Sequence, residues 1–176
     1  VSVRDTRAER AGPAKAMVTT AHVAVNEAMR TPQFWMLWVI LCVNVTAGIG
    51  ILEEASPMIQ EIFKGRVLAP AAAGFVSLLS LANMGGRFAW SSLSDKIGRR
   101  ATYFTFFALG AALYGSIPTV AATQSVPLFV VVCVVVLTMY GGGFATIPAC
   151  LRDLFGTMHV GAIRGRLLTA WSTAGV

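Results

Sequence analysis

The chain has 176 residues, of which 56% are hydrophobic and only 12% are charged, and its formal net charge is +6. Soluble domains average about 45–50% apolar and about 25% charged residues, so this composition excludes an ordinary soluble domain and indicates a membrane protein. Nucleic-acid binding would need a basic face with interleaved aromatic residues, which the sequence does not offer, so the positive charge predicts membrane topology rather than a nucleic-acid partner.

The first part of the chain, residues 1–33, is polar and rich in alanine. It lacks the charged start, apolar centre and cleavage site of a signal peptide, so we expect a cytoplasmic segment rather than a leader. Thr31 and Pro32 then give a capping threonine followed by proline at the first helical position, which predicts the start of a helix.

Long apolar runs follow, with lengths suited to the roughly 30 Å of a bilayer's hydrocarbon core. They predict an all-α polytopic bundle over residues 34–176, with membrane spans at about 34–52, 69–90, 101–118 and 127–150 and the start of a fifth at 162–176. Loops are expected at 53–66, at 119–126, where Pro118 and Pro127 interrupt a long uncharged run, and at 152–166. Since the fifth apolar run stops too early to span, we expect the chain to be a fragment.

Lysine and arginine are concentrated in alternate segments, namely 1–33, 87–100 and 152–166. Short cytoplasmic loops carry an excess of these residues, so the pattern places residues 1–33 in the cytoplasm and predicts an integral, multi-pass protein of the plasma (inner) membrane. Arg152 and Asp153 are expected to form an ion pair at the membrane interface. Glu53 and Glu54 are expected at the outer edge, too exposed for a buried proton relay.

The second span carries a polar stripe, because its polar residues recur at steps of three and four. On a helix they share an arc of roughly 120°, which must face protein or water rather than lipid. The stripe consists of Ser77, Ser80, Asn83, Arg87 and Ser91. Arg87 lies roughly 12 Å deeper than the loop carboxylate that follows, at about 1.5 Å per residue. Arg87 and Asn83 are candidate substrate contacts; Arg87 also suits extension to the interface on its long stem, or a link to that carboxylate.

A dense group of charges, SDKIGRR at 94–100, ends the second span. It resembles the loop motif of the major facilitator superfamily of transporters, with Ser91 in place of the leading glycine. The matching charged and glycine residues are Asp95, Lys96, Gly98, Arg99 and Arg100. Asp95 and the arginines that follow it are expected to form a structural latch rather than a substrate site, because a carboxylate near the N-terminus of helix 11 is stabilising, and such a latch must break and reform as the halves of a carrier rock. The resemblance also implies a partial major facilitator fold, helices 7 to 10 and the start of 11.

Four separated blocks narrow the resemblance: TPQFWMLWVILCVNVTAGIGILEEASPMIQE at 31–61, GFVSLLSLANMGGRFAWSSLSDKIGRR at 74–100, YGGGFATIPACLRDLFG at 140–156 and GRLLTAWSTAGV at 165–176. They look like the oxalate/formate antiporter family. That likeness implies a secondary active transporter that exchanges small carboxylates, or couples them to protons, with formate, another monocarboxylate or an oxalate-like anion as substrate. The implied partners are this small organic anion, the lipid bilayer and an N-terminal half of the same carrier.

The resemblance also bears on the charge of the substrate. Members that carry oxalate are expected to use a basic residue in the second span, here Arg87, and a lysine in helix 11. After Lys96 this sequence has no lysine, and the residues from 167 onward offer Thr169, Trp171 and Ser172 instead. A monocarboxylate, which needs one cationic partner, is therefore at least as well supported as a doubly charged substrate.

Three further residues are cavity candidates: Asn44 in the first span, Tyr140 in the fourth and Trp171 in the fifth. Asn44 equally suits a hydrogen bond between helices. Tyr140 precedes the glycines at 141–143, which could let the helix bend around a substrate but also suit a close helix crossing.

Other chemistries find no support in the sequence, so we expect no enzyme, no cofactor and no metal site. The residues that could have formed a metal site are scattered, without ligand spacing: His22, Cys42, Cys133, Cys150 and His159. The run GGGF lacks the ending of a phosphate-binding loop, and no nucleophile elbow is present. The remaining alternatives are a carrier of a different small solute and a non-transporting sensor on the same fold.

Overall fold

The structure is a computed structural model that describes residues 23–175. Within that part of the chain it contains α-helices and no strand, as the sequence predicts. The helices are α2 (Val25–Ala28), α3 (Pro32–Ile62), α4 (Ala69–Ile97), α5 (Arg99–Ala122), α6 (Val126–Phe155), α7 (Val160–Leu167) and α8 (Thr169–Ala174). Most of the expected cytoplasmic segment, including His22, lies outside the described residues.

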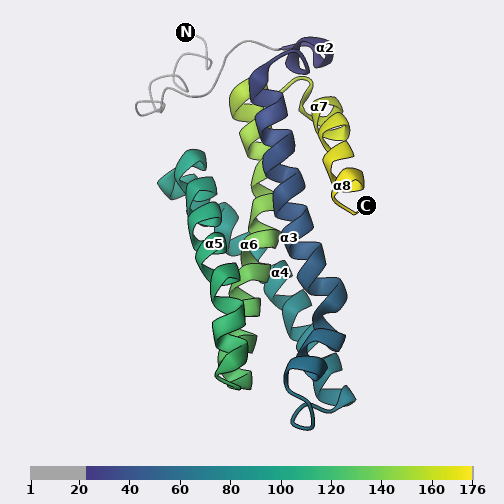
Figure 1. Cartoon of the computed structure of the whole chain (residues 1–176). Helices are drawn as coiled ribbons and strands as arrows, with labels where there is room; N and C mark the ends of the chain where they lie inside the picture. Colours follow the sequence, from purple (N-terminus) through teal and green to yellow (C-terminus); the bar gives the residue numbers. More distant parts are fainter. Residues whose placement is uncertain (1–22, 176) are drawn as a thin grey trace.

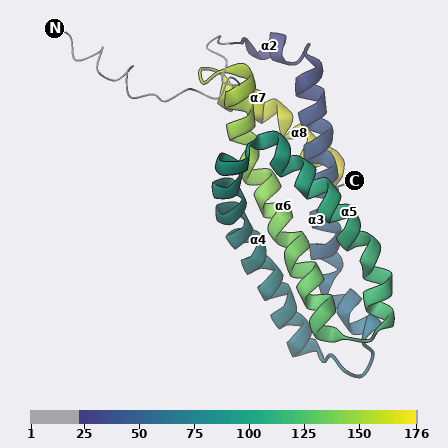
Figure 2. The same ribbon diagram turned by 90° about the vertical axis from the view of Figure 1, so that its left-hand side faces the viewer.

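Helices α3 to α6 run alternately up and down in one elongated bundle (Figures 1 and 2). Helix α2, the start of α3 and the start of α7 lie at one end of it. The turns between α3 and α4 and between α5 and α6 lie at the other end. The basic segments at 87–100 and 152–166 therefore meet at the same end of the bundle, as the alternation of charge predicts.

The first long helix begins where the sequence indicates and ends later. The Thr31 hydroxyl accepts a hydrogen bond from the Phe34 amide at 3.4 Å, and Pro32 occupies the first turn. Helix α3 then continues to Ile62, so Glu53 and Glu54 lie on the helix, and the expected loop at 53–66 is wrong except for its end. Glutamate is a good helix former, and a charge ends a hydrophobic run without ending a helix.

The helices that contain the expected third and fourth spans are also longer than those spans. Helix α5 passes through Pro118 to Ala122, and α6 begins at Val126, so the expected loop at 119–126 shortens to residues 123–125. Proline is tolerated in membrane helices because neighbouring groups satisfy the backbone that it frees. Helix α6 likewise contains Pro148 and ends at Phe155, while the expected fifth span is divided into α7 and α8 at Leu168.

Among residues 23–175, three helices are long and apolar enough to cross a membrane: α3, α5 and α6. Helix α4 is not among them, because the polar stripe lowers its mean hydropathy. Its place in the bundle follows instead from packing, since its buried residues Ala72, Phe75 and Leu79 belong to the same core as those of α6. The most buried of the long helices is α6, with its buried residues distributed along its whole length.

Small residues allow α4 and α6 to approach closely. A Cβ atom added at Gly86 of α4 would overlap the Thr138 backbone of α6. In the opposite direction, a Cβ atom at Gly141 would meet Asn83, and one at Gly142 would meet the Trp90 side chain. The glycines of α6 therefore lie at a close helix crossing, one of the two roles that the sequence allows for them. No lipid fits between the two helices at this level.

Candidate functional site

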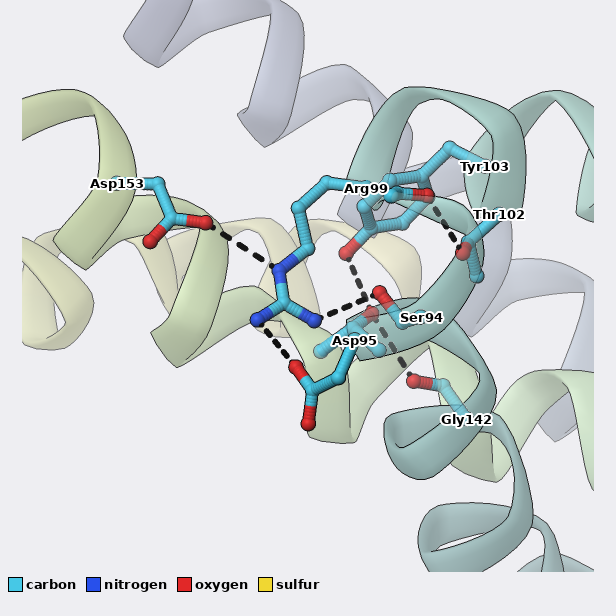
Figure 3. Close-up of polar contacts among 9 residues, drawn as sticks. Ser94, Asp95, Arg99, Thr102, Tyr103, Gly142 and Asp153 are labelled. Carbon is cyan, nitrogen blue, oxygen red and sulfur yellow. Dashed lines mark hydrogen bonds and ion pairs between the residues drawn. The ribbon is translucent and has the colours of Figure 1, made fainter. Parts of the chain in front are cut away.

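Arg99, the first residue of α5, connects the ends of α4 and α6 (Figure 3). Its Nη2 lies 2.6 Å from Asp95 Oδ1, its Nη1 donates to Ser94 Oγ at 2.8 Å, and its Nε donates to Asp153 Oδ2 at 3.3 Å. The Arg99 and Asp153 side chains are mostly buried, with 17% and 21% exposed, whereas that of Asp95 is 67% exposed. The guanidinium fork therefore holds three helix ends together with charge-assisted bonds.

The expected pair of Arg152 and Asp153 is wrong, because Asp153 pairs with Arg99 instead. Neighbours in a helix point in different directions, so the two side chains of such a pair do not face each other. Lys96 and Arg100, the other basic residues of the motif, are exposed and form no ion pair with any of residues 23–175.

Gly98 has a geometric role in the same motif. It joins α4 to α5 with φ of 90° and ψ of 154°, a backbone conformation that favours glycine. Its amide donates to the Ser94 carbonyl at 3.0 Å, and its carbonyl accepts from the Thr102 hydroxyl at 2.9 Å. The turn therefore sets the direction in which α5, which begins at Arg99, continues from the end of α4.

A buried polar contact continues from Arg99 into the bundle, one turn along α5. The Tyr103 hydroxyl donates to the Gly143 carbonyl of α6 at 3.2 Å and accepts from the Thr146 hydroxyl at 2.9 Å. Tyr103 and Thr146 are both buried. These bonds fix α5 against the glycine-rich part of α6.

Arg87, the candidate substrate contact of the polar stripe, lies over an aromatic ring of α6. Its Cζ is 5.7 Å from the centroid of the Phe144 ring, a cation–π distance. Arg87 is exposed and forms no ion pair with a carboxylate in the described part of the chain. It therefore joins neither Asp95 nor the Arg99 contacts, which leaves its charge available.

The Phe144 ring also contacts residues of α7 and α8, where the fifth span is expected to begin. Trp171 of α8 packs against Phe144 with ring centroids 5.1 Å apart and an angle of 88° between the planes. Arg164 of α7 lies over Phe144 as well, with its Cζ 5.6 Å from the centroid. We call Arg87, Phe144, Arg164 and Trp171 the Phe144 cluster; it contains side chains from four helices.

Asn44 and Tyr140 lie elsewhere, at a groove of about 240 Å³ between α3, α5 and α6. The Asn44 amide nitrogen donates to the Tyr140 backbone carbonyl at 3.2 Å. The Tyr140 ring is buried against Gly48, where a side chain would overlap it. Asn44 thus makes the interhelical hydrogen bond that the sequence allowed, and the groove around both residues is lined mainly by apolar side chains.

Asn83 lies at the crossing of α4 and α6. Its backbone oxygen and its side-chain Oδ1 face Gly141, where a Cβ atom would overlap them. Its position sets the spacing of α4 and α6 next to Tyr140. Of the candidate substrate contacts named from the sequence, Arg87 and Trp171 belong to the Phe144 cluster and the others do not.

Sequence reasoning missed Phe144, Arg164 and the role of Asp153. Phe144 is one aromatic residue in an apolar span, and Arg164 falls within a segment whose charges were assigned to topology. The one sequence signal for Phe144 and Arg164 is a joint helical projection of α6 and α7. The contacts of both residues depend on how α4, α6 and α7 are arranged in space.

Comparisons with known proteins agree with this architecture. The sequence model of the Major Facilitator Superfamily matches residues 1–176. The chain is 32% identical over 163 residues to an oxalate:formate antiporter of Oxalobacter formigenes, covering 91% of this chain and 37% of that protein.

Two further relatives are more distant. The MFS-type transporter YhjX of Escherichia coli K12 is 30% identical over 134 residues, which cover 74% of this chain and 31% of that protein. Apicoplast pyruvate carrier 1 of Toxoplasma gondii is 26% identical over 150 residues, which cover 82% and 27%. The chain thus spans about a third of the length of the curated relatives it matches.

Proposed function

This chain belongs to the major facilitator superfamily, a family of carriers rather than enzymes, and from that premise we propose that it works in a secondary transporter that moves small carboxylate anions by alternating access. The bundle of α3 to α6 with α7 and α8 then corresponds to helices 7 to 10 and the start of 11. Residues 1–33 form a cytoplasmic segment, and the carrier lies in the plasma (inner) membrane.

The observation that carries the proposal is the position of Arg87. A guanidinium on a membrane helix is costly unless it has a partner, and intramembrane charges are usually functional. Here the partner among the described residues is an aromatic face, which orients the group without neutralising its charge. Guanidinium matches a carboxylate in bidentate geometry, so the anion supplies the missing partner when it binds.

The names of two relatives support the same class of substrate. One is an oxalate:formate antiporter and another is a pyruvate carrier, and oxalate, formate and pyruvate are all small carboxylates. The binding sites of such folds lie between two halves of the carrier. We therefore infer that an N-terminal half supplies the other wall of the site, opposite Arg87 and Trp171.

Arg99 supplies the conformational element of the proposal. Alternating access moves one half of a carrier against the other and opens one end of the bundle at a time. The ion pairs of Arg99 with Asp95 and Asp153 lie at the end where the basic segments meet. They form a latch that holds the helix ends together in one state and loosens in the other.

Counterflow in proteoliposomes tests this function, with the carrier that contains this chain and its N-terminal half. Vesicles loaded in turn with formate, lactate, oxalate or a neutral sugar are assayed for uptake of the same labelled compound. We expect exchange of at least one carboxylate and none of the sugar. Sugar exchange, or silence on every compound, would refute the proposal, and carboxylate binding without flux would favour a sensor.

Arg87→Gln identifies the residue responsible, with Arg152→Gln as the matched control. Both remove one guanidinium from an exposed side chain of the described bundle, but Arg152 lies outside the Phe144 cluster and lines a different pocket beside Pro148. We expect Arg87→Gln to abolish carboxylate exchange while the protein still inserts and unfolds at the usual temperature. Normal affinity and flux in Arg87→Gln would remove Arg87 from the site.

A further inference from the structure

The Phe144 cluster contains two positive charges and, among residues 23–175, no carboxylate in an ion pair with either. Arg87 arrives from α4 and Arg164 from α7, and both guanidinium groups lie within 5.7 Å of the centroid of the same ring. Their Cζ atoms are therefore no farther apart than the sum of these two distances.

At the upper bound of this separation, about 11 Å, salt largely screens the repulsion between solvent-exposed like charges, and the repulsion grows where the charges are closer or water is excluded. The quadrupole of the Phe144 ring attracts each guanidinium, but it carries no net charge and leaves the repulsion in place. Trp171 packs against the ring and helps fix its orientation. The cluster is thus a fixed aromatic support with two unneutralised cations, which an anion with two negative charges would neutralise.

Other arginines of the described bundle have different surroundings. Arg99 is neutralised by Asp95 and Asp153, and the Arg166 Nη1 donates to the Asn26 side chain at 3.0 Å. Arg66 donates to the Gln124 carbonyl at the opposite end of the bundle. Arg87 and Arg164 are set apart because they converge on one ring next to Trp171.

We propose that Arg164 is a second substrate contact, which together with Arg87 gives the site a preference for doubly charged carboxylates over singly charged ones. This inference rests on the proposed function, since it assigns the substrate class of the same site. It reverses the expectation drawn from the missing lysine. The second positive charge is Arg164, on the short helix α7 that leads into residues 167–176, the expected part of helix 11.

The test compares oxalate with formate in the counterflow assay, using wild type, Arg164→Gln, Arg164→Lys and the Arg152→Gln control. A hydrogen-bonded charge pair is worth about tenfold or more in affinity. We expect Arg164→Gln to lower oxalate exchange about tenfold or more relative to formate exchange. Arg164→Lys should recover part of the preference, because it restores the charge without the planar fork, and Arg152→Gln should keep the wild-type ratio.

A second measurement separates binding from folding and from turnover. Oxalate and formate are added to the purified carrier, and the rise in its unfolding temperature is measured for each ligand. We expect the stabilisation by oxalate to shrink in Arg164→Gln while the stabilisation by formate persists. A general folding defect would instead lower the ligand-free unfolding temperature and affect both ligands equally.

The possible failures are distinguishable. If wild type exchanges carboxylates and Arg87→Gln abolishes this, but Arg164→Gln keeps an oxalate-to-formate ratio within twofold of wild type, the assignment of Arg164 is overturned and the proposed function stands. The assignment of Arg164 would also be overturned if the wild-type carrier exchanged monocarboxylates and no dicarboxylate. Absence of exchange with every carboxylate would refute both proposals together.

Discussion

Adjacent glycines of α4 provide a direct test of the close crossing with α6. At Gly86 a Cβ atom would lie 2.7 Å from the Thr138 carbonyl carbon, well inside van der Waals contact, and the neighbour is backbone that cannot rotate away. At Gly85 nothing lies within 4 Å. Gly86→Ala and Gly85→Ala therefore make the same chemical change one residue apart, with opposite steric consequences.

The expected magnitudes follow from these surroundings. Overpacking costs about 1–3 kcal/mol, whereas replacing glycine by alanine within a helix gains up to about 1 kcal/mol. Gly86→Ala should thus destabilise the bundle by about 1–2 kcal/mol, and Gly85→Ala should leave its stability unchanged or raise it slightly. For a chain of this size each kcal/mol shifts the unfolding temperature by about 2–4 °C, so a difference of about 2 kcal/mol between the two variants should separate their unfolding temperatures by roughly 4–8 °C.

Buried cysteines offer a natural readout of this difference. Cys133 and Cys150 are buried and unpaired with each other, so a thiol-reactive fluorescent dye reports their exposure as the detergent-solubilised protein is heated. The control is wild type in the same detergent. Equal unfolding temperatures for Gly86→Ala and Gly85→Ala would refute the argument that α4 and α6 are in backbone contact at this level.

Three further predictions concern other contacts. Asp95→Asn weakens the ion pair with Arg99, and counterflow should show slower turnover with little change in half-saturation; a weaker affinity at unchanged turnover would contradict the latch. Tyr103→Phe removes a buried hydroxyl that bonds α6, so the unfolding free energy should fall by about 1–2 kcal/mol while transport per folded molecule is retained; an unchanged unfolding midpoint would count against these bonds. Trp38→Phe removes the 3.0 Å hydrogen bond from the indole to the Thr169 hydroxyl, so protease should cut the segment from α7 to α8 faster than in wild type. Equal cleavage rates would show that other contacts hold α8.

The fold could be predicted from the sequence because its determinants are local. Hydrophobic length identifies α3, α5 and α6, Thr31 and Pro32 give the start of α3, and alternate basic segments give the shared end of the bundle. Helix ends were predicted less well, since Glu53 and Pro118 end an apolar run without ending the helix. Local signals identify which residues suit a helix, but contacts with other helices decide how far it continues.

The candidate site was predicted only in part, for a related reason. Arg87 is conspicuous as a charge in a polar stripe, but its aromatic partner Phe144 and the second guanidinium of Arg164 depend on the crossing of three helices. Asp153 was paired with its sequence neighbour, whereas its partner Arg99 lies on another helix. Contacts between residues far apart in sequence depend on how the helices pack against each other. The residue spacing within one helix does not determine that packing.

Helix α6 contains both Phe144 and, about 14 Å further along at 1.5 Å per residue, Asp153. Pro148 lies between them and has no N–H, so the Phe144 carbonyl lacks its usual donor from four residues later. The helix therefore lacks one backbone hydrogen bond between the ring that supports the arginines and the carboxylate that holds Arg99. A bend at Pro148 would tilt the Phe144 cluster while the contacts of Arg99 with Asp95 and Asp153 stay formed, so that binding at the proposed site and release of the proposed latch would be two successive events on one helix.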